Sequence, residues 1–267
     1  MYIDRGYVFA NESGGYLHTN TLYRRFHDLI TRADVPVIRF HDLRHTRATV
    51  AKSALIDLVT DTLPPGTAVS LRAFGAVPDS CDSRLVVPRQ PLDPSAMAET
   101  LQDLEVVNLV KTPLGDSLAA VAGDLGATPG PKIVVLVTDG EETCGGDPPA
   151  VIADLVASGI DVRVNIVGFA LDDDALREQF EEWARLGNGQ YIDAIDAAEL
   201  DAAIARAVQP LFNVIDSQGN IVASGQVGGP ALSLPAGIYR VEVLTQPTLN
   251  YEVVRVTAGQ EMQLVIG

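Results

Sequence analysis

The chain has 267 residues, 47% hydrophobic and 20% charged, which is typical of a globular protein with two or three domains. Its formal net charge of −16 argues against nucleic acid as the partner of the whole chain, because phosphate binding needs clustered basic residues. No apolar run is long enough for a membrane span, and the N-terminus carries no secretory pattern, so we expect a cytoplasmic product as encoded.

The composition changes near residue 50. Residues 1–50 carry seven arginines and five acidic residues, a net charge of +2, which leaves 12 basic and 30 acidic residues, net −18, for residues 51–267. All four histidines lie in the first 45 residues, whereas the first lysine is Lys52. These differences predict a domain boundary near residue 50.

The first elements are a short strand at residues 6–10, a helix over Thr21–Ala33 and a second helix that begins near His41. Apolar and small residues continue this second helix across residue 50 until Pro64-Pro65-Gly66 stops it. The predicted N-terminal domain, residues 1–50, is therefore a helical fragment.

From residue 67 strands and helices alternate. We expect strands at 68–74, 85–87, 133–137, 162–167 and 190–192, and helices at about 94–106, 113–125, 148–158, 173–186 and 197–208. Three helix starts share a capping residue followed by proline: Asp93-Pro94, Thr112-Pro113 and Asp147-Pro148. Nearly continuous apolar strands between helices predict an α/β, Rossmann-like fold, with a mostly parallel sheet and helices on both faces.

After Pro210 the pattern becomes short strands separated by turns, at 212–215, 221–224, 238–244, 251–256 and 263–266. The stretch LPAGIYRVEV, residues 234–243, resembles the hairpin of prealbumin-like modules. Residues 211–267 are therefore expected to form a small C-terminal β-sandwich, in which no catalytic grouping stands out.

The most informative motif is VVLVTDGEETCGGDP, residues 134–148, preceded by KTPLGDSL at 111–118. This pair resembles the von Willebrand factor type A family, and the similarity covers the predicted domain 51–210. The resemblance implies a protein-binding module without catalysis, in which a metal-ion-dependent adhesion site holds Mg²⁺ and an acidic residue of the protein partner completes the coordination. Thr112 would be a direct ligand and Asp139 a ligand through water.

One part of that family site is missing. The family's D-x-S-x-S element is absent, since Asp79-Ser80-Cys81-Asp82-Ser83 has cysteine in place of the first serine. Mg²⁺ prefers six oxygens, so we expect weak or vestigial metal binding at Thr112 and Asp139. The alternatives are that Thr112 is a helix N-cap and that Asp139 is a turn residue.

Cys81 and Cys144 fall in loops on the same rim of the predicted sheet. Family members with similar cysteine segments look exported, which implies a disulfide and an extracytoplasmic origin for residues 51–267. Two free thiols in a reducing cytoplasm are the alternative.

Residues 7–50 resemble part of a tyrosine recombinase (phage integrase) catalytic domain, through the H-x-x-R pair His41 and Arg44. In that family such a pair contacts the scissile phosphate, which implies DNA binding through residues 1–50 as the alternative function. No tyrosine lies between Tyr23 and Tyr191, so the nucleophile is missing and we expect an inactive remnant. The chain thus resembles a gene fusion in which the first, central strand of the second domain is lost and residues 6–10 are a candidate replacement.

Overall fold

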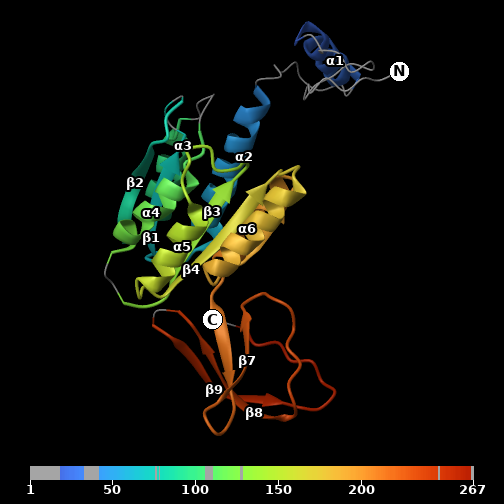
Figure 1. Ribbon diagram of the computed structural model, residues 1–267. Coiled ribbons are helices and arrows are strands. Elements are labelled where there is room, and N and C mark those ends of the chain that lie inside the picture. Colours follow the sequence, from blue (N-terminus) through green and yellow to red (C-terminus); the bar gives the residue numbers. More distant parts are fainter. Residues whose placement is uncertain are drawn as a thin grey trace. The chain divides into compact units, whose positions relative to one another are not determined.

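The computed structural model describes residues 19–32, 42–75, 77, 79–105, 111–126, 129–245 and 247–265. The chain divides into two compact units, Met1–Thr49 and Val50–Gly267 (Figure 1). The predicted strand at residues 6–10 lies outside the described residues. Within the described ranges, no helix combines the length and the apolar character that crossing a membrane requires.

Two helices form the N-terminal part of the described chain, α1 (Thr19–Arg32) and α2 (Asp42–Asp57). A short π-helical segment, η1 (Leu58–Thr62), extends α2 and ends just before Pro64. The predicted helix that crosses residue 50 is therefore confirmed. In the second half of this helix, Ala54 and Leu58 are buried against the α/β part of the second unit, so this half has one apolar face that packs on the core.

A parallel sheet forms the centre of the α/β part, in the order β3 (Lys132–Thr138), β4 (Val162–Phe169) and β5 (Tyr191–Ala194). Every residue of β4 is buried, which explains the nearly continuous apolar sequence. The exceptions are Arg163 and Asn165. The side-chain amide of Asn165 donates to the carbonyl of Ala207 at 2.5 Å and accepts from the backbone N–H of Gln190 at 3.0 Å. The predicted parallel strands are confirmed.

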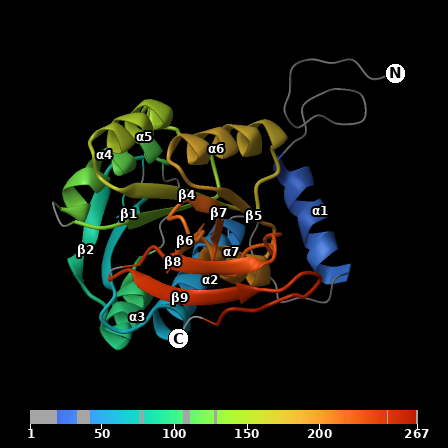
Figure 2. The same ribbon diagram turned by 90° about the horizontal axis from the view of Figure 1, so that it is seen from below.

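Helices cover both faces of this sheet, as the sequence predicts. One face packs against α4 (Leu114–Leu125), α5 (Pro148–Ala157) and α6 (Asp174–Leu186), and the other against α2, η1 and α7 (Ala197–Ala207). Figure 2 shows α4, α5 and α6 on one side of β4 and α2 and α7 on the opposite side. The fold is thus α/β with a covered parallel sheet.

A second sheet contains β1 (Ala68–Phe74) and β2 (Ser83–Pro91), which pair antiparallel. The strand β2 is longer than the predicted 85–87, and α3 (Pro94–Asp103) follows it. In the described part of the chain, this sheet shares no ladder with β3. It is tied to α4 by Arg72, which donates to the two carboxylate oxygens of Asp124 at 2.6 and 2.9 Å.

Two of the three predicted helix starts are confirmed. The side chain of Asp93 accepts from the backbone of Ala96 at 3.1 Å, and that of Asp147 accepts from Ala150 at 3.2 Å. In both helices a proline follows the capping residue, where its missing N–H costs nothing.

The C-terminal strands form one antiparallel sheet in the order β7 (Ile221–Gln226), β6 (Leu211–Ile215), β8 (Gly237–Val243) and β9 (Leu249–Val256). One face is buried around Val214, Val241 and Val243. The described residues supply no second sheet of a sandwich. The strand predicted at 263–266 is wrong over residues 263–265, which are exposed and unpaired in the described chain, and residue 266 lies outside it.

Candidate functional site

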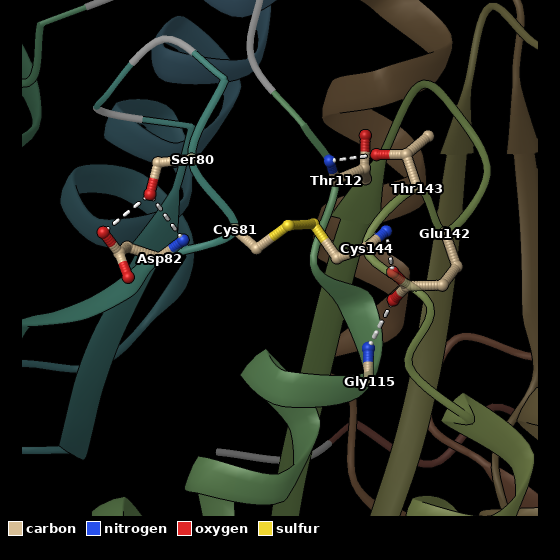
Figure 3. The surroundings of a disulfide bond; sticks show 8 residues. All are labelled: Ser80, Cys81, Asp82, Thr112, Gly115, Glu142, Thr143 and Cys144. Atoms are coloured by element: carbon tan, nitrogen blue, oxygen red, sulfur yellow. Dashed lines mark hydrogen bonds between the residues drawn. A yellow bond between two sulfur atoms is a disulfide. The ribbon is translucent and has the colours of Figure 1, made fainter.

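The loops that leave β1 and β3 meet the start of α4 at the carboxyl end of the parallel sheet, where ligands bind in open α/β folds. A disulfide joins Cys81 to Cys144, with 5.8 Å between their Cα atoms (Figure 3). The sequence allowed either a disulfide or two free thiols, and the structure contains the disulfide. We call residues 79–82, 111–116 and 139–147 the disulfide rim.

Hydrogen bonds attach the segment before α4 to the loop after β3. The backbone N–H of Thr112 donates to the hydroxyl of Thr143 at 2.7 Å, and the backbone N–H of Thr143 donates back to the carbonyl of Thr112 at 3.1 Å. The cap of α4 is Pro113, without a side-chain cap. The expectation that Thr112 caps this helix is therefore wrong, because its backbone is held by a loop 31 residues away.

Glu142 takes the place that a capping side chain would have. One of its carboxylate oxygens accepts from the backbone N–H of Gly115 at 2.8 Å, and the other accepts from that of Cys144 at 2.5 Å (Figure 3). The first turn of a helix carries partial positive charge, so a carboxylate is stabilised there. Sequence reasoning noted Glu142 only as part of a motif, and the sole signal for its role was an acidic residue close to a helix start.

The backbones of α4 and the rim loop touch at two glycines. A Cβ atom added to Gly115 would lie 2.9 Å from the Cα of Gly146, and one added to Gly146 would lie 3.0 Å from the Cα of Gly115. Side chains at either position would force the loop away from the helix. The glycines therefore let the rim loop pack directly against the backbone of α4.

The described rim residues form no cluster of acidic metal ligands. Both oxygens of Glu142 are already occupied by backbone donors. Among the described residues, no three histidine, cysteine, aspartate or glutamate side chains gather as metal ligands. Thr112 and Asp139 alone leave most of six coordination positions to water. Their role as ligands stays a prediction.

The rim is instead strongly acidic at its surface. It exposes the carboxylates of Asp79, Asp82, Asp116, Asp139, Glu141 and Asp147, against the one exposed amine of Lys111. Acidic residues gathered on one surface make the local electrostatic potential negative and attract positively charged groups. The rim thus presents a fixed, negatively charged surface.

The recombinase-like pair is only partly described. His41 lies outside the described residues, and Arg44 belongs to α2 by its backbone, without a described side chain. The geometry of the H-x-x-R pair therefore stays a prediction.

No family model matches the chain. It is 38% identical over 47 residues to the tyrosine recombinase XerC-like protein of Caldanaerobacter subterraneus, which covers 18% of this chain and only 12% of that protein. Among solved structures, proximal thread matrix protein 1 of the mussel byssus, with a zinc-occupied MIDAS motif, aligns with a TM-score of 0.50 and 20% identity. That alignment covers 62% of this chain and 43% of the mussel protein, and it shows the fold alone.

A longer sequence match comes from Bacillus subtilis. The uncharacterized protein YwmD is 34% identical over 160 residues, which cover 56% of this chain and 70% of YwmD. The chain therefore belongs to the same family as YwmD, and its α/β part has the von Willebrand factor A type of fold.

Proposed function

We propose that the α/β part, residues 51–210, is a protein-binding module without catalytic activity that contacts its partner through the disulfide rim. The observation that carries the proposal is the construction of the rim. Three segments from distant parts of the chain are joined there by a covalent bond, reciprocal threonine hydrogen bonds and the carboxylate of Glu142. A surface that is already ordered loses little entropy when it binds.

The acidic rim favours a partner with a basic surface. Its exposed carboxylates would repel an acidic partner unless a cation lay between them, and among the described residues no three acidic, histidine or cysteine side chains gather to hold one. The Mg²⁺-mediated contact to an acidic residue, which the family resemblance implies, is the competing mechanism. The two mechanisms predict opposite charges on the partner.

Binding to rim variants tests the proposal. The full chain, immobilised in its oxidised form, should capture a partner from extract of its source cells, and Asp139→Asn combined with Glu141→Gln should weaken that capture. The matched control is Glu252→Gln, which removes an exposed carboxylate on β9 of the C-terminal sheet. Equal capture by wild type and the rim double variant would contradict the proposal.

Calorimetric titration with Mg²⁺ alone separates the two mechanisms. We expect no binding tighter than about 1 mM and no rise in melting temperature. Tight binding that Thr112→Val or Asp139→Asn abolishes would restore the metal-dependent mechanism.

We also propose that residues 1–50 are a recombinase remnant without activity, on the basis of the short match and the missing nucleophile. Any DNA affinity should be weak and lost with salt, since only phosphate contacts would remain. A gel shift with duplex DNA that persists at physiological salt would contradict this.

The disulfide supports an origin of residues 51–267 in an oxidising compartment, because such bonds persist there and are reduced in the cytosol. Alkylation of thiols in intact cells measures the state of Cys81 and Cys144. Protection from alkylation is expected where the compartment is oxidising, and full labelling would exclude it.

A further inference from the structure

The two sheets of the α/β part lie under the same helices. On one face, Phe74 of β1 and Val134 of β3 pack into a single cluster with Leu118 of α4. On the other face, Leu55 of α2 and Leu63 after η1 contact the clusters under both sheets. The sheets are thus held side by side, although in the described chain β1 pairs only with β2 and β3 only with β4.

The register shows which backbone groups line the unpaired edge of β3. The N–H groups of Val164 and Ile166 in β4 donate to carbonyls on the β5 side. In a parallel ladder, successive residues of a strand bond alternately to its two neighbours, so the residues of β4 between these two bond to β3. The β3 residues directly opposite them direct their own N–H and C=O groups away from β4. By this register, Ile133, Val135 and Val137 direct their N–H and C=O groups to the edge that faces away from β4.

Burial supports a missing neighbour at this edge. All eight residues of β4 are buried, whereas in β3 only Leu136 and Thr138 are, in spite of the sequence KIVVLVT. Parallel strands of this composition normally lie between two neighbours and two helix layers. A row of unpaired N–H and C=O groups beside apolar side chains is a template for one more strand.

We propose that the facing edges of β1 and β3 bind an extended segment of a separate polypeptide, which adds a strand parallel to β3. The backbone edges select an extended chain, and the helix layers on both faces select β-branched or other apolar side chains along its length. To match β3 the segment needs about six residues. This inference goes beyond the proposed rim contact, because it concerns the strand edges themselves.

Charge specifies the residues at the end of the segment. A strand parallel to β3 leaves the sheet at the disulfide rim, where exposed carboxylates gather, Asp82 and Glu141 among them. The residues that follow the apolar run should therefore be basic. A segment with an acidic end would meet charges of its own sign.

Hydrogen exchange of the full oxidised chain, followed by NMR, tests the proposal with synthetic peptides. The probe is TVIVIVKK, used below its aggregation concentration. Its controls are TVIPIPKK, in which prolines remove two donors, and TVIVIVEE, in which the charge is reversed. The peptides carry the changes, so the folding of the protein does not affect the comparison.

We expect the amides of Ile133, Val135 and Val137 to exchange at least about tenfold more slowly with the lysine peptide, while amides of β9 are unchanged. The proline peptide should have no effect and the glutamate peptide a smaller one. Unchanged exchange with the lysine peptide would overturn the proposal. Slow exchange of these amides in the chain alone would overturn it too, since the edge would already be filled, and residues 6–10 would be the segment to examine.

Discussion

Removal of the disulfide should destabilise the unit Val50–Gly267 strongly. Cys81 and Cys144 are 63 residues apart in sequence, and a cross-link over a loop of that size stabilises the folded state by about 4 kcal/mol in the chain-entropy model. For a unit of this size, such a loss lowers the melting temperature by about 8–16 °C. The bond also connects a loop after β1 with the loop after β3, which no ladder joins in the described chain.

The double variant Cys81→Ala with Cys144→Ala is compared with oxidised wild type by urea unfolding and by calorimetry. Reduced wild type should behave like the double variant, and Gly123→Ala, in the same α/β part, should not. A loss below about 1 kcal/mol would refute the reasoning, because the chain-entropy term would then be cancelled by residual structure in the unfolded state.

Three further predictions test other parts of the structure. Asn165→Ala should cost about 1–3 kcal/mol in urea unfolding, since it removes the side-chain partner of a buried carbonyl at Ala207 and of a half-buried N–H at Gln190, and no measurable cost would contradict this. Gly115→Ala should cost about 1–3 kcal/mol through its clash with the rim loop, whereas Gly123→Ala, which meets nothing within 4 Å, should be neutral or stabilising. Asp216 accepts from the backbone N–H of Asn220, which lowers the pKa of its carboxyl group. Its contribution to stability is therefore present above the ordinary pKa of aspartate and is lost as pH falls through the lowered pKa, and an NMR titration with an ordinary midpoint would contradict this.

Local signals in the sequence predicted most of the elements. The strands β3 and β4 follow from runs such as IVVLV, because a strand buried on both faces has no room for polar alternation. Asp93 and Asp147 marked helix starts correctly, since a cap needs only the side chain and the backbone three residues later.

The features that sequence reasoning missed depend on contacts between distant segments. Thr112 has the same local pattern as the two correct caps, yet its backbone is held by Thr143. Glu142 binds the start of α4 across 27 residues, a contact that no local spacing reveals. The division into two sheets was equally invisible, because pairing between strands is decided by tertiary structure rather than by strand propensity.

The pairing of the cysteines was left open for a different reason. Their position on one rim followed from the predicted topology, but the oxidation state of a thiol depends on the compartment, which the local sequence does not specify. The structure brings Cys81 and Cys144 within bonding distance, so the fold permits the disulfide that the sequence could not decide.

The boundary between the two units falls inside a continuous helix, α2, rather than in a loop. A helix propagates through local hydrogen bonds and repeats every 3.6 residues, whatever side chains precede it. The phase in which Ala54 and Leu58 meet the core is therefore set by the helix itself. A different upstream sequence that kept α2 helical up to its middle would present Val50, Ala51 and Ala54 to the core in the same orientation.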